Sequence, residues 1–147
     1  MKKPLPPTYF TCGLLAMALL HLLVPGPRLV HWPWRWLGVI PILDGLLLNL
    51  WADRLFKRHK TEVKPFREST SLVVEGPFRI SRNPMYLGGA LIFIGAALLF
   101  GTVTPWIVVP VMAYLALAHF ILPEEEDMER QFGEAYREYK KKVRRWI

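Results

Sequence analysis

The chain has 147 residues, which is enough for a single domain. Its hydrophobic fraction of 52% and mean hydropathy of +0.22 argue against an ordinary soluble protein. The net charge of +7 comes from basic residues that flank apolar segments, which favours membrane lipid over nucleic acid as the partner. Cys12 is the only cysteine and the four histidines are scattered, so we expect neither a disulfide nor a metal site.

Four apolar segments follow one another along the chain, and each is close to the shortest length that can span a membrane, about 17–25 residues. Lys2 and Lys3 precede the first segment as in a signal peptide, but no small-residue cleavage site follows, so we expect a retained helix. The sequence therefore predicts an all-α integral membrane protein, a single domain over residues 1–147, with spans at about 9–24, 34–52, 85–100 and 105–122.

The charges between these segments predict the orientation of the chain. The tail after the fourth segment is strongly basic, whereas the link over residues 101–104 has no charge. The long loop over residues 53–84 carries Arg54, Lys57, Arg58, Lys60, Lys64, Arg67, Arg79 and Arg82. The positive-inside rule then places this loop and both termini in the cytoplasm, for a protein of the plasma or inner membrane.

The last two segments are joined so tightly that we expect an antiparallel helical hairpin. Gly88 and Gly95 recur at seven residues and share one helix face, where small residues let another helix approach closely in lipid.

Beyond Pro123 the pattern becomes that of an amphipathic helix, predicted over residues 123–145 on the cytoplasmic face. Apolar side chains recur every three or four residues, acids crowd its start, and bases crowd its end, which suits the helix dipole. The apolar positions are Met128, Phe132, Tyr136, Tyr139 and Val143.

Polar residues inside the predicted spans are candidates for function, because an ionisable group in lipid is costly. They are His21, Asp44 and Asn49. Asp44 is the strongest of them and has no evident basic partner in the spans, so its role stays open. His21 lies near the end of its span, where a structural role is more common.

A polar cluster is predicted at the cytoplasmic end of the hairpin. Tyr86 opens the third span and Glu124 and Glu125 follow the fourth, so antiparallel packing brings them together. Arg82 and Asn83 come just before the tyrosine, beside the helix breakers Gly-Pro and Asn-Pro. A carboxylate and an aromatic face suit a ligand with a cation or a ribose. The alternative is that Glu124 only caps the following helix.

The stretch Leu72–Gly89, LVVEGPFRISRNPMYLGG, and the later block with Glu124-Glu125, Phe132-Gly133, Tyr136 and Tyr139 resemble the isoprenylcysteine carboxyl methyltransferase and phospholipid methyltransferase superfamily. The two blocks cover about residues 61–146, and the first two spans match in hydropathy alone.

This resemblance implies an integral-membrane enzyme that uses S-adenosylmethionine in a cytoplasmic pocket, while a lipophilic or amphiphilic acceptor enters between the spans. Carried over position by position, it assigns cofactor contacts to Thr70, Ser71, Leu72, Val73, Phe78, Asn83, Pro84, Met85, Tyr86 and Glu124. Methyl transfer needs alignment and desolvation, with no covalent intermediate.

The chain departs from the family pattern at the acceptor side. Asn83 stands where many members have histidine, and Arg144 replaces a proline. Phe120 occupies the position at which carboxyl methyltransferases carry an arginine that holds the substrate carboxylate. His119, next to Phe120, is the candidate catalytic base or substrate contact.

We therefore expect a methyltransferase that depends on S-adenosylmethionine, with oxygen, nitrogen or sulfur of the acceptor as the nucleophile. Two alternatives remain at this point: an NADPH-dependent enzyme similar to sterol reductases, and a non-catalytic lipid-binding or scaffold protein of the membrane. The acceptor and the oligomeric state do not follow from the sequence.

Overall fold

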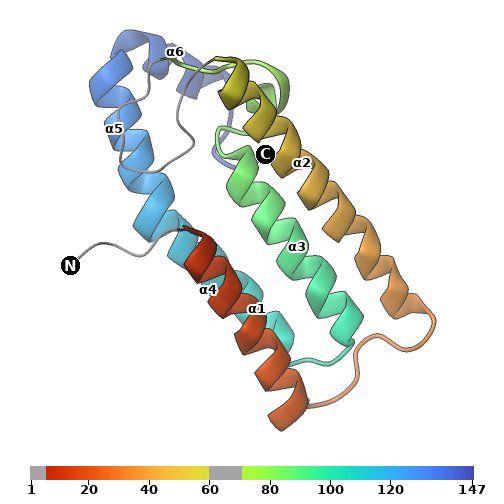
Figure 1. Cartoon of the computed structure of the whole chain (residues 1–147). Coiled ribbons are helices and arrows are strands. Elements are labelled where there is room, and N and C mark those ends of the chain that lie inside the picture. The colour runs from red at the N-terminus through yellow and green to blue at the C-terminus, as the bar shows by residue number, and fades with distance from the viewer. Residues whose placement is uncertain (1–5, 60–70) are drawn as a thin grey trace.

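The computed structural model describes residues 6–59 and 71–147, and there the chain is a bundle of long helices (Figure 1). No strand occurs in these two stretches, which form only an isolated antiparallel bridge between Arg28 and Thr102. The elements are α1 (Pro6–Leu23), η1 (Trp34–Gly38), α2 (Val39–Arg58), η2 (Gly76–Arg79), α3 (Pro84–Phe100), α4 (Pro105–Ala116), the π-helical η3 (Leu117–Ile121), α5 (Leu122–Phe132) and α6 (Glu134–Lys142).

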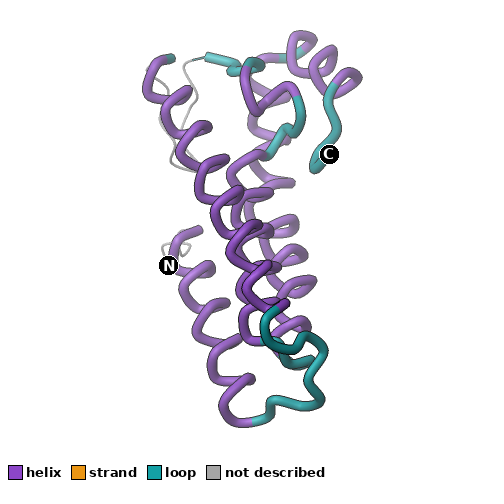
Figure 2. The backbone as a smooth tube through the Cα atoms, turned by 90° about the vertical axis from the view of Figure 1, so that its right-hand side faces the viewer, coloured by secondary structure: helices purple, strands orange, loops and turns teal. Residues whose placement is uncertain are grey.

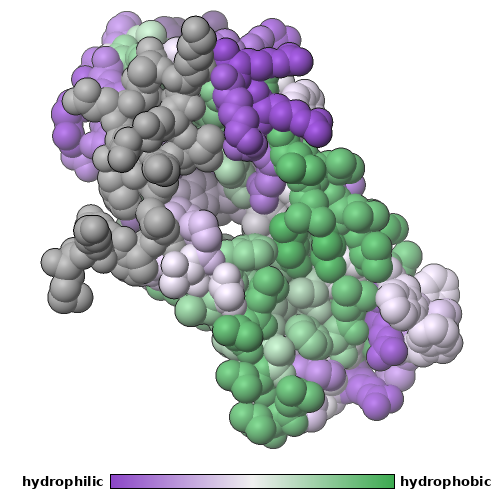
Figure 3. Space-filling view, viewed as in Figure 1, coloured by the Kyte–Doolittle hydropathy of each residue, from purple (hydrophilic) through white to green (hydrophobic). Residues whose placement is uncertain are grey.

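Three of the described helices are long and apolar enough to cross a membrane: Pro6–Leu23, Trp34–Arg58 and Pro105–Phe132. Helix α3 is apolar but shorter, with 17 residues. Hydrophobic side chains cover much of the visible surface over the middle and lower parts of the bundle, and hydrophilic ones gather at its upper end, with a smaller hydrophilic group at the lower end (Figure 3). The structure is thus that of an all-helical membrane protein, with the helices close to the predicted spans.

Helix α2 runs six residues further than the predicted second span, since it continues to Arg58. The predicted cytoplasmic loop over residues 53–84 accordingly begins later, and its residues 60–70 lie outside the described residues.

Helices α2 and α3 approach each other at the level of their backbones. A Cβ atom at Gly88 would collide with the Asn49 side chain and the Gly45 carbonyl, and one at Gly95 would collide with the Gly38 carbonyl. In the same way, a Cβ atom at Gly38 or at Gly45 would collide with a backbone carbonyl of α3. The glycine face predicted for the third span is therefore the contact with α2.

The two links at one end of the bundle are tied together. The amides of Leu29 and Val30 both donate to the Gly101 carbonyl, at 2.9 and 3.1 Å, and the Val103 amide donates to the Pro27 carbonyl at 3.1 Å. Gly101 ends α3 with a φ of 72°, a left-handed conformation that glycine adopts readily. Figure 2 shows these links at the opposite end from residues 71–83 and α6.

A single continuous helix connects the membrane part to the acidic segment. It comprises α4, η3 and α5, and its stretch without acidic residues, lysine or arginine covers residues 105–122, so Glu124 and Glu125 lie beyond the predicted fourth span. In η3 the Leu122 amide donates to the Leu117 carbonyl, five residues back. Pro123 lacks an amide hydrogen and crowds the preceding turn, and the wider π turn lies directly before it.

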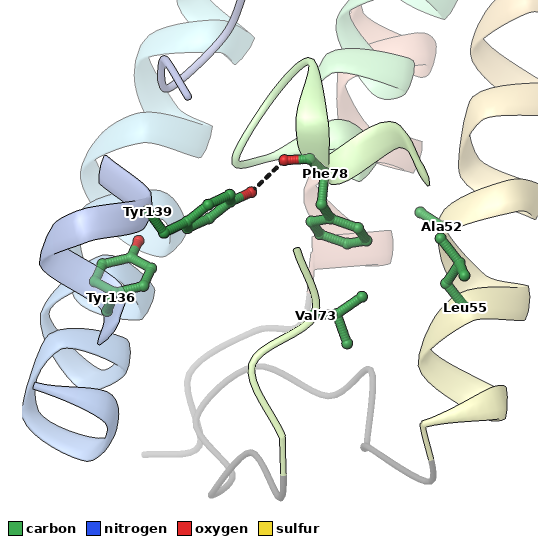
Figure 4. Packing of buried hydrophobic residues seen from close by; sticks show 6 residues of the cluster. All are labelled: Ala52, Leu55, Val73, Phe78, Tyr136 and Tyr139. Atoms are coloured by element: carbon green, nitrogen blue, oxygen red, sulfur yellow. Dashed lines mark hydrogen bonds between the residues drawn. The ribbon is translucent and has the colours of Figure 1, made fainter. Parts of the chain in front are cut away.

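The C-terminal segment differs from the single helix predicted over residues 123–145. Gly133 interrupts it with a φ of 52° and a ψ of −122°, so α5 ends at Phe132 and α6 begins at Glu134. Tyr136 and Tyr139 of α6 are nevertheless buried in one cluster with residues of α2 and η2 (Figure 4). The break lets α6 fold back over the end of the bundle.

Candidate functional site

One large cavity, of about 750 Å³, lies at the end of the bundle where residues 71–83 and the C-terminal segment meet the helices. Every helix from α1 to α6 contributes to its lining, and so does Trp146 near the end of the chain. The lining is mainly apolar, with a few charged side chains gathered near α5. A volume of this size is within the range of about 300–1,000 Å³ that is typical of small-molecule sites.

A tyrosine and a carboxylate form the first polar pair of the cavity. The Tyr86 hydroxyl at the start of α3 donates to Glu124 Oε1 in α5, at 2.7 Å. Burial raises the pKa of the Glu124 carboxyl to about 7, although the hydrogen bond from Tyr86 opposes this rise. Glu124 therefore changes its charge near neutral pH, at the wall of a largely apolar cavity.

A second carboxylate, Glu125, anchors the C-terminal tail. Arg145 donates to it through two nitrogens, Nε at 3.0 Å and Nη2 at 2.9 Å, and Arg82 Nη2 lies 3.4 Å from the same carboxylate. Asn83 Nδ2 donates to Glu125 and to the Arg145 carbonyl. Burial alone would raise the pKa of Glu125, but the hydrogen bond from Arg145 and the charge of Arg82 hold it below its usual range.

Two donor nitrogens of the Arg82 side chain have no hydrogen-bond partner. Its side chain is 9% exposed and lines the cavity, yet Nε and Nη1 are buried without a hydrogen-bond partner. With Glu125 and Arg145 it forms a cluster of two positive charges and one negative charge. A buried guanidinium with unpartnered donors favours an anionic group, because leaving such donors unpaired costs free energy.

Residues 71–79 form another wall of the cavity. Val73 and Phe78 are buried, and the Phe78 ring packs edge-on against Phe56 of α2 with centroids 5.1 Å apart. The Tyr139 hydroxyl donates to the Phe78 carbonyl, as Figure 4 shows. The hydrogen bond ties the turn of η2 to α6, so the wall is held from both sides.

Three aromatic rings meet on the side of the cavity formed by α1, α3 and η3. Phe120, 3% exposed, stacks on Tyr86 with centroids 6.2 Å apart and contacts Tyr9 edge-on at 5.1 Å. His119 is exposed and does not line the cavity; its ring lies 5.9 Å from Tyr9, and Nδ1 lies 3.1 Å from the Leu115 carbonyl.

The polar residues of the predicted spans separate in the structure. Asn49 lines the cavity, and its Oδ1 is buried without a hydrogen-bond partner. Asp44 is exposed on α2 and does not line the cavity. His21 lies at the far end of the bundle, where Nδ1 is 2.8 Å from Thr102 Oγ1.

The structure brings most of the predicted site residues to this one cavity. Thr70 lies outside the described residues. The other nine predicted cofactor contacts all line the cavity: Ser71, Leu72, Val73, Phe78, Asn83, Pro84, Met85, Tyr86 and Glu124. The sequence prediction of cofactor contacts omitted Arg82, although that residue stands in the same motif. Arg145 does not line the cavity and meets the site through Glu125, a contact for which the sequence carries no signal beyond a basic tail.

Comparison with known proteins identifies the family. Residues 33–135, most of the chain, match the phospholipid methyltransferase family. An uncharacterized protein of Haemophilus influenzae is 38% identical over 63 residues, which are 43% of this chain and the whole of that protein. No solved structure matches the chain. The matched region contains Arg82, Tyr86, Glu124 and Glu125, and the family name denotes methyl transfer to phospholipid. The chain belongs to the phospholipid methyltransferase family, within the superfamily of integral-membrane methyltransferases.

Proposed function

We propose that this protein transfers a methyl group from S-adenosylmethionine to a lipid or amphiphilic acceptor at the cytoplasmic face of the membrane. The observation that carries the proposal is the convergence of nine predicted cofactor contacts on one cavity, listed above, beside the Tyr86–Glu124 pair. The family match supports the transferred group, and the apolar helices support a membrane-bound acceptor.

The residues of the cavity fit the functional groups of the proposed donor. When bound, the donor supplies a methyl group on a positively charged sulfur, which the acceptor nucleophile takes in an in-line displacement. Glu124 can accept hydrogen bonds from an ammonium or from ribose hydroxyls, and Arg82 has buried donors for a carboxylate. Leu72, Val73 and Phe78 offer an apolar wall to a heterocycle.

The chain's own part in the reaction is to hold, orient and exclude water. The cavity lies between helices whose outer surfaces are apolar, so an acceptor headgroup can enter with its acyl chains in lipid. Displacement at carbon needs close alignment of the two reactants and a dry site, and no covalent intermediate with the protein.

The acceptor side of the cavity favours an amine over a carboxylate. Tyr9 and Phe120 present aromatic rings there, next to the ring of Tyr86. Aromatic faces attract a cationic headgroup such as an ethanolamine, whereas Phe120 cannot hold a carboxylate. The ammonium would give a proton to water before its nitrogen takes the methyl group, and the donor sulfur would leave as a neutral thioether with the bonding electron pair. We therefore propose a phospholipid nitrogen, rather than a prenylcysteine carboxyl group, as the methyl acceptor.

The proposal includes the arrangement in the membrane. One domain crosses the bilayer four times, with α3 as the shortest span, and both termini and residues 53–84 face the cytoplasm. Helices α5 and α6 then lie at the cytoplasmic surface, and α6 ends in Lys140, Lys141 and Lys142, which suits anionic lipid.

The test has a binding part and a transfer part. Calorimetry on the purified full-length protein in detergent compares S-adenosylhomocysteine with NADPH; binding of the first alone is expected, and binding of NADPH alone would favour a reductase. Transfer of a labelled methyl group is then followed to phosphatidylethanolamine, to a prenylcysteine analogue and to a small thiol.

Matched variants separate a site from a scaffold. Tyr86→Phe removes the hydroxyl that donates to Glu124 and is expected to weaken cofactor binding, whereas Tyr114→Phe alters an exposed tyrosine of α4 and should not. Binding that is equal in both variants, or absent from the unmodified protein, contradicts the proposed site. His119→Ala tests the candidate base, and unchanged turnover removes His119 from the mechanism.

A further inference from the structure

A second cavity, of about 320 Å³, lies at the opposite end of the bundle and is lined by basic side chains. Arg28, His31 and Arg35 come from the link between α1 and α2, and His21 comes from the end of α1. No acidic residue lines it within residues 6–59 and 71–147. The cavity shares no lining residue with the proposed methyl-transfer site.

The two guanidinium groups of this cavity have no carboxylate partner in the part of the chain that the structure describes. Neither Arg28 nor Arg35 takes part in an ion pair among the described residues, and Arg35 instead lies over the Trp32 ring, 5.7 Å from its centroid. Two like charges in one cavity repel each other, and an anion between them would relieve this repulsion. Guanidinium groups bind phosphate oxygens through two parallel hydrogen bonds.

Hydrogen bonds hold the backbone around this second cavity. The Arg28 segment forms a bridge with Thr102, and the amides of Leu29 and Val30 donate to the carbonyl of Gly101, a residue that also lines the cavity. His21 is held by Thr102, itself buried, and packs against the Phe100 ring at 4.9 Å. The basic side chains are thus mounted on a link that is fixed to the α3–α4 turn.

The surroundings of the cavity are those of a membrane interface. Trp32 and Trp34 are 68% and 66% exposed, and tryptophan gathers at the level of lipid headgroups. Leu22 and Leu23, at the end of α1, are 74% and 76% exposed and offer an apolar surface to acyl chains. A ligand here contacts both cationic side chains and an apolar surface. A free phosphate ion has no hydrocarbon part to bury against that surface.

We propose that this second cavity binds the phosphodiester of an anionic phospholipid, held by Arg28 and Arg35 in the leaflet opposite the methyl-transfer site. The absence of a carboxylate in the cavity selects a headgroup of net negative charge over a zwitterionic one. The bound lipid is a structural ligand rather than the methyl acceptor, because the two cavities lie at opposite ends of the bundle.

The test measures lipid binding to the purified full-length protein by native mass spectrometry in detergent. Phosphatidylglycerol is titrated into the unmodified protein, into the pair Arg28→Gln/Arg35→Gln, and into the matched pair Arg54→Gln/Arg58→Gln. All four arginines are exposed, but Arg54 and Arg58 lie at the other end of α2, away from the second cavity. Each arginine near a membrane surface contributes about 1 kcal/mol, so the first pair is expected to bind the first lipid about 30-fold more weakly.

Two controls separate binding of an anionic lipid from binding of any phospholipid or of free phosphate. Phosphatidylcholine should bind the unmodified protein more weakly, and inorganic phosphate should not displace phosphatidylglycerol. Single Arg35→Gln, with an expected loss of about fivefold, replaces the double variant if that one does not fold. Equal losses in the two double variants, no loss in either, equal binding of phosphatidylcholine, or displacement by phosphate would each overturn the proposal.

Discussion

Replacement of Glu124 by glutamine tests the chemistry of the proposed site most directly. Glutamine keeps the size of the side chain and an oxygen that can accept the hydrogen bond from Tyr86, which is 2.7 Å long in the structure. What it removes is the negative charge. A charge-assisted hydrogen bond to a ligand contributes about 1.5–3 kcal/mol, so cofactor binding should weaken about 10- to 150-fold at a pH where Glu124 is ionised.

The pH dependence gives the same prediction a second signature. Because the pKa of Glu124 is about 7, the carboxyl is mostly protonated below that pH. Cofactor affinity of the unmodified protein should therefore rise from about pH 6 to about pH 8, and that of Glu124→Gln should stay flat.

Stability without ligand should move in the opposite direction. The pKa of Glu124 is about 7 in the folded protein and 4.5 for the free side chain, so the folded state disfavours ionisation. The unliganded protein should lose stability as the pH rises through this window, by at most about 3 kcal/mol. Glu124→Gln lacks this loss, and it should be the more stable protein above neutral pH.

Calorimetry with S-adenosylhomocysteine over a pH series, and thermal unfolding of the unliganded protein in detergent, measure the two effects. Glu126→Gln is the matched control, because the Glu126 side chain is 79% exposed on the same helix. The reasoning is refuted if Glu124→Gln binds as tightly as Glu126→Gln at every pH, or if the unmodified protein shows no pH dependence.

Three further changes test the packing, each by thermal unfolding in detergent. Gly88→Ala places a methyl group against the α2 backbone and should lower the free energy of unfolding by about 1–3 kcal/mol. Gly89→Ala should be tolerated, because the nearest atom to its added Cβ is 3.8 Å away. Equal effects of the two substitutions would contradict the close approach of α2 and α3. Glu125→Ala leaves two arginines without their carboxylate and should cost about 3–5 kcal/mol, against little change in Glu126→Ala. Tyr139→Phe leaves a buried carbonyl of η2 without its donor and should cost about 1–3 kcal/mol, and an unchanged melting temperature would show that the bond contributes nothing.

Local patterns and short connections made much of this structure predictable. The uncharged four-residue link after Phe100 requires antiparallel helices, and this alone brings Tyr86 within reach of Glu124. The seven-residue spacing of Gly88 and Gly95 likewise predicts a close helix contact, because it repeats along one helix face.

The features that sequence reasoning missed depend on the path of the chain in space. The clamp of Arg145 on Glu125 forms because Gly133 breaks the terminal helix and the tail after Lys142 turns back towards α3. Periodicity does not reveal such a turn, since the apolar positions continue through Gly133 in helical spacing. The unpartnered donors of Arg82 are equally invisible without coordinates, because they depend on what does not reach that side chain.

The glycine contact between α2 and α3 has a mechanical consequence for the cavity. Where the backbones of α2 and α3 meet at these glycines, neither helix has room to shift towards the other, so we expect this pair to move little. On another side of the bundle α1 meets the helix of α4, η3 and α5 through larger side chains, such as the edge-on rings of Tyr9 and Phe120. We therefore expect any widening of the cavity to come from the side where α1 meets the helix of α4, η3 and α5.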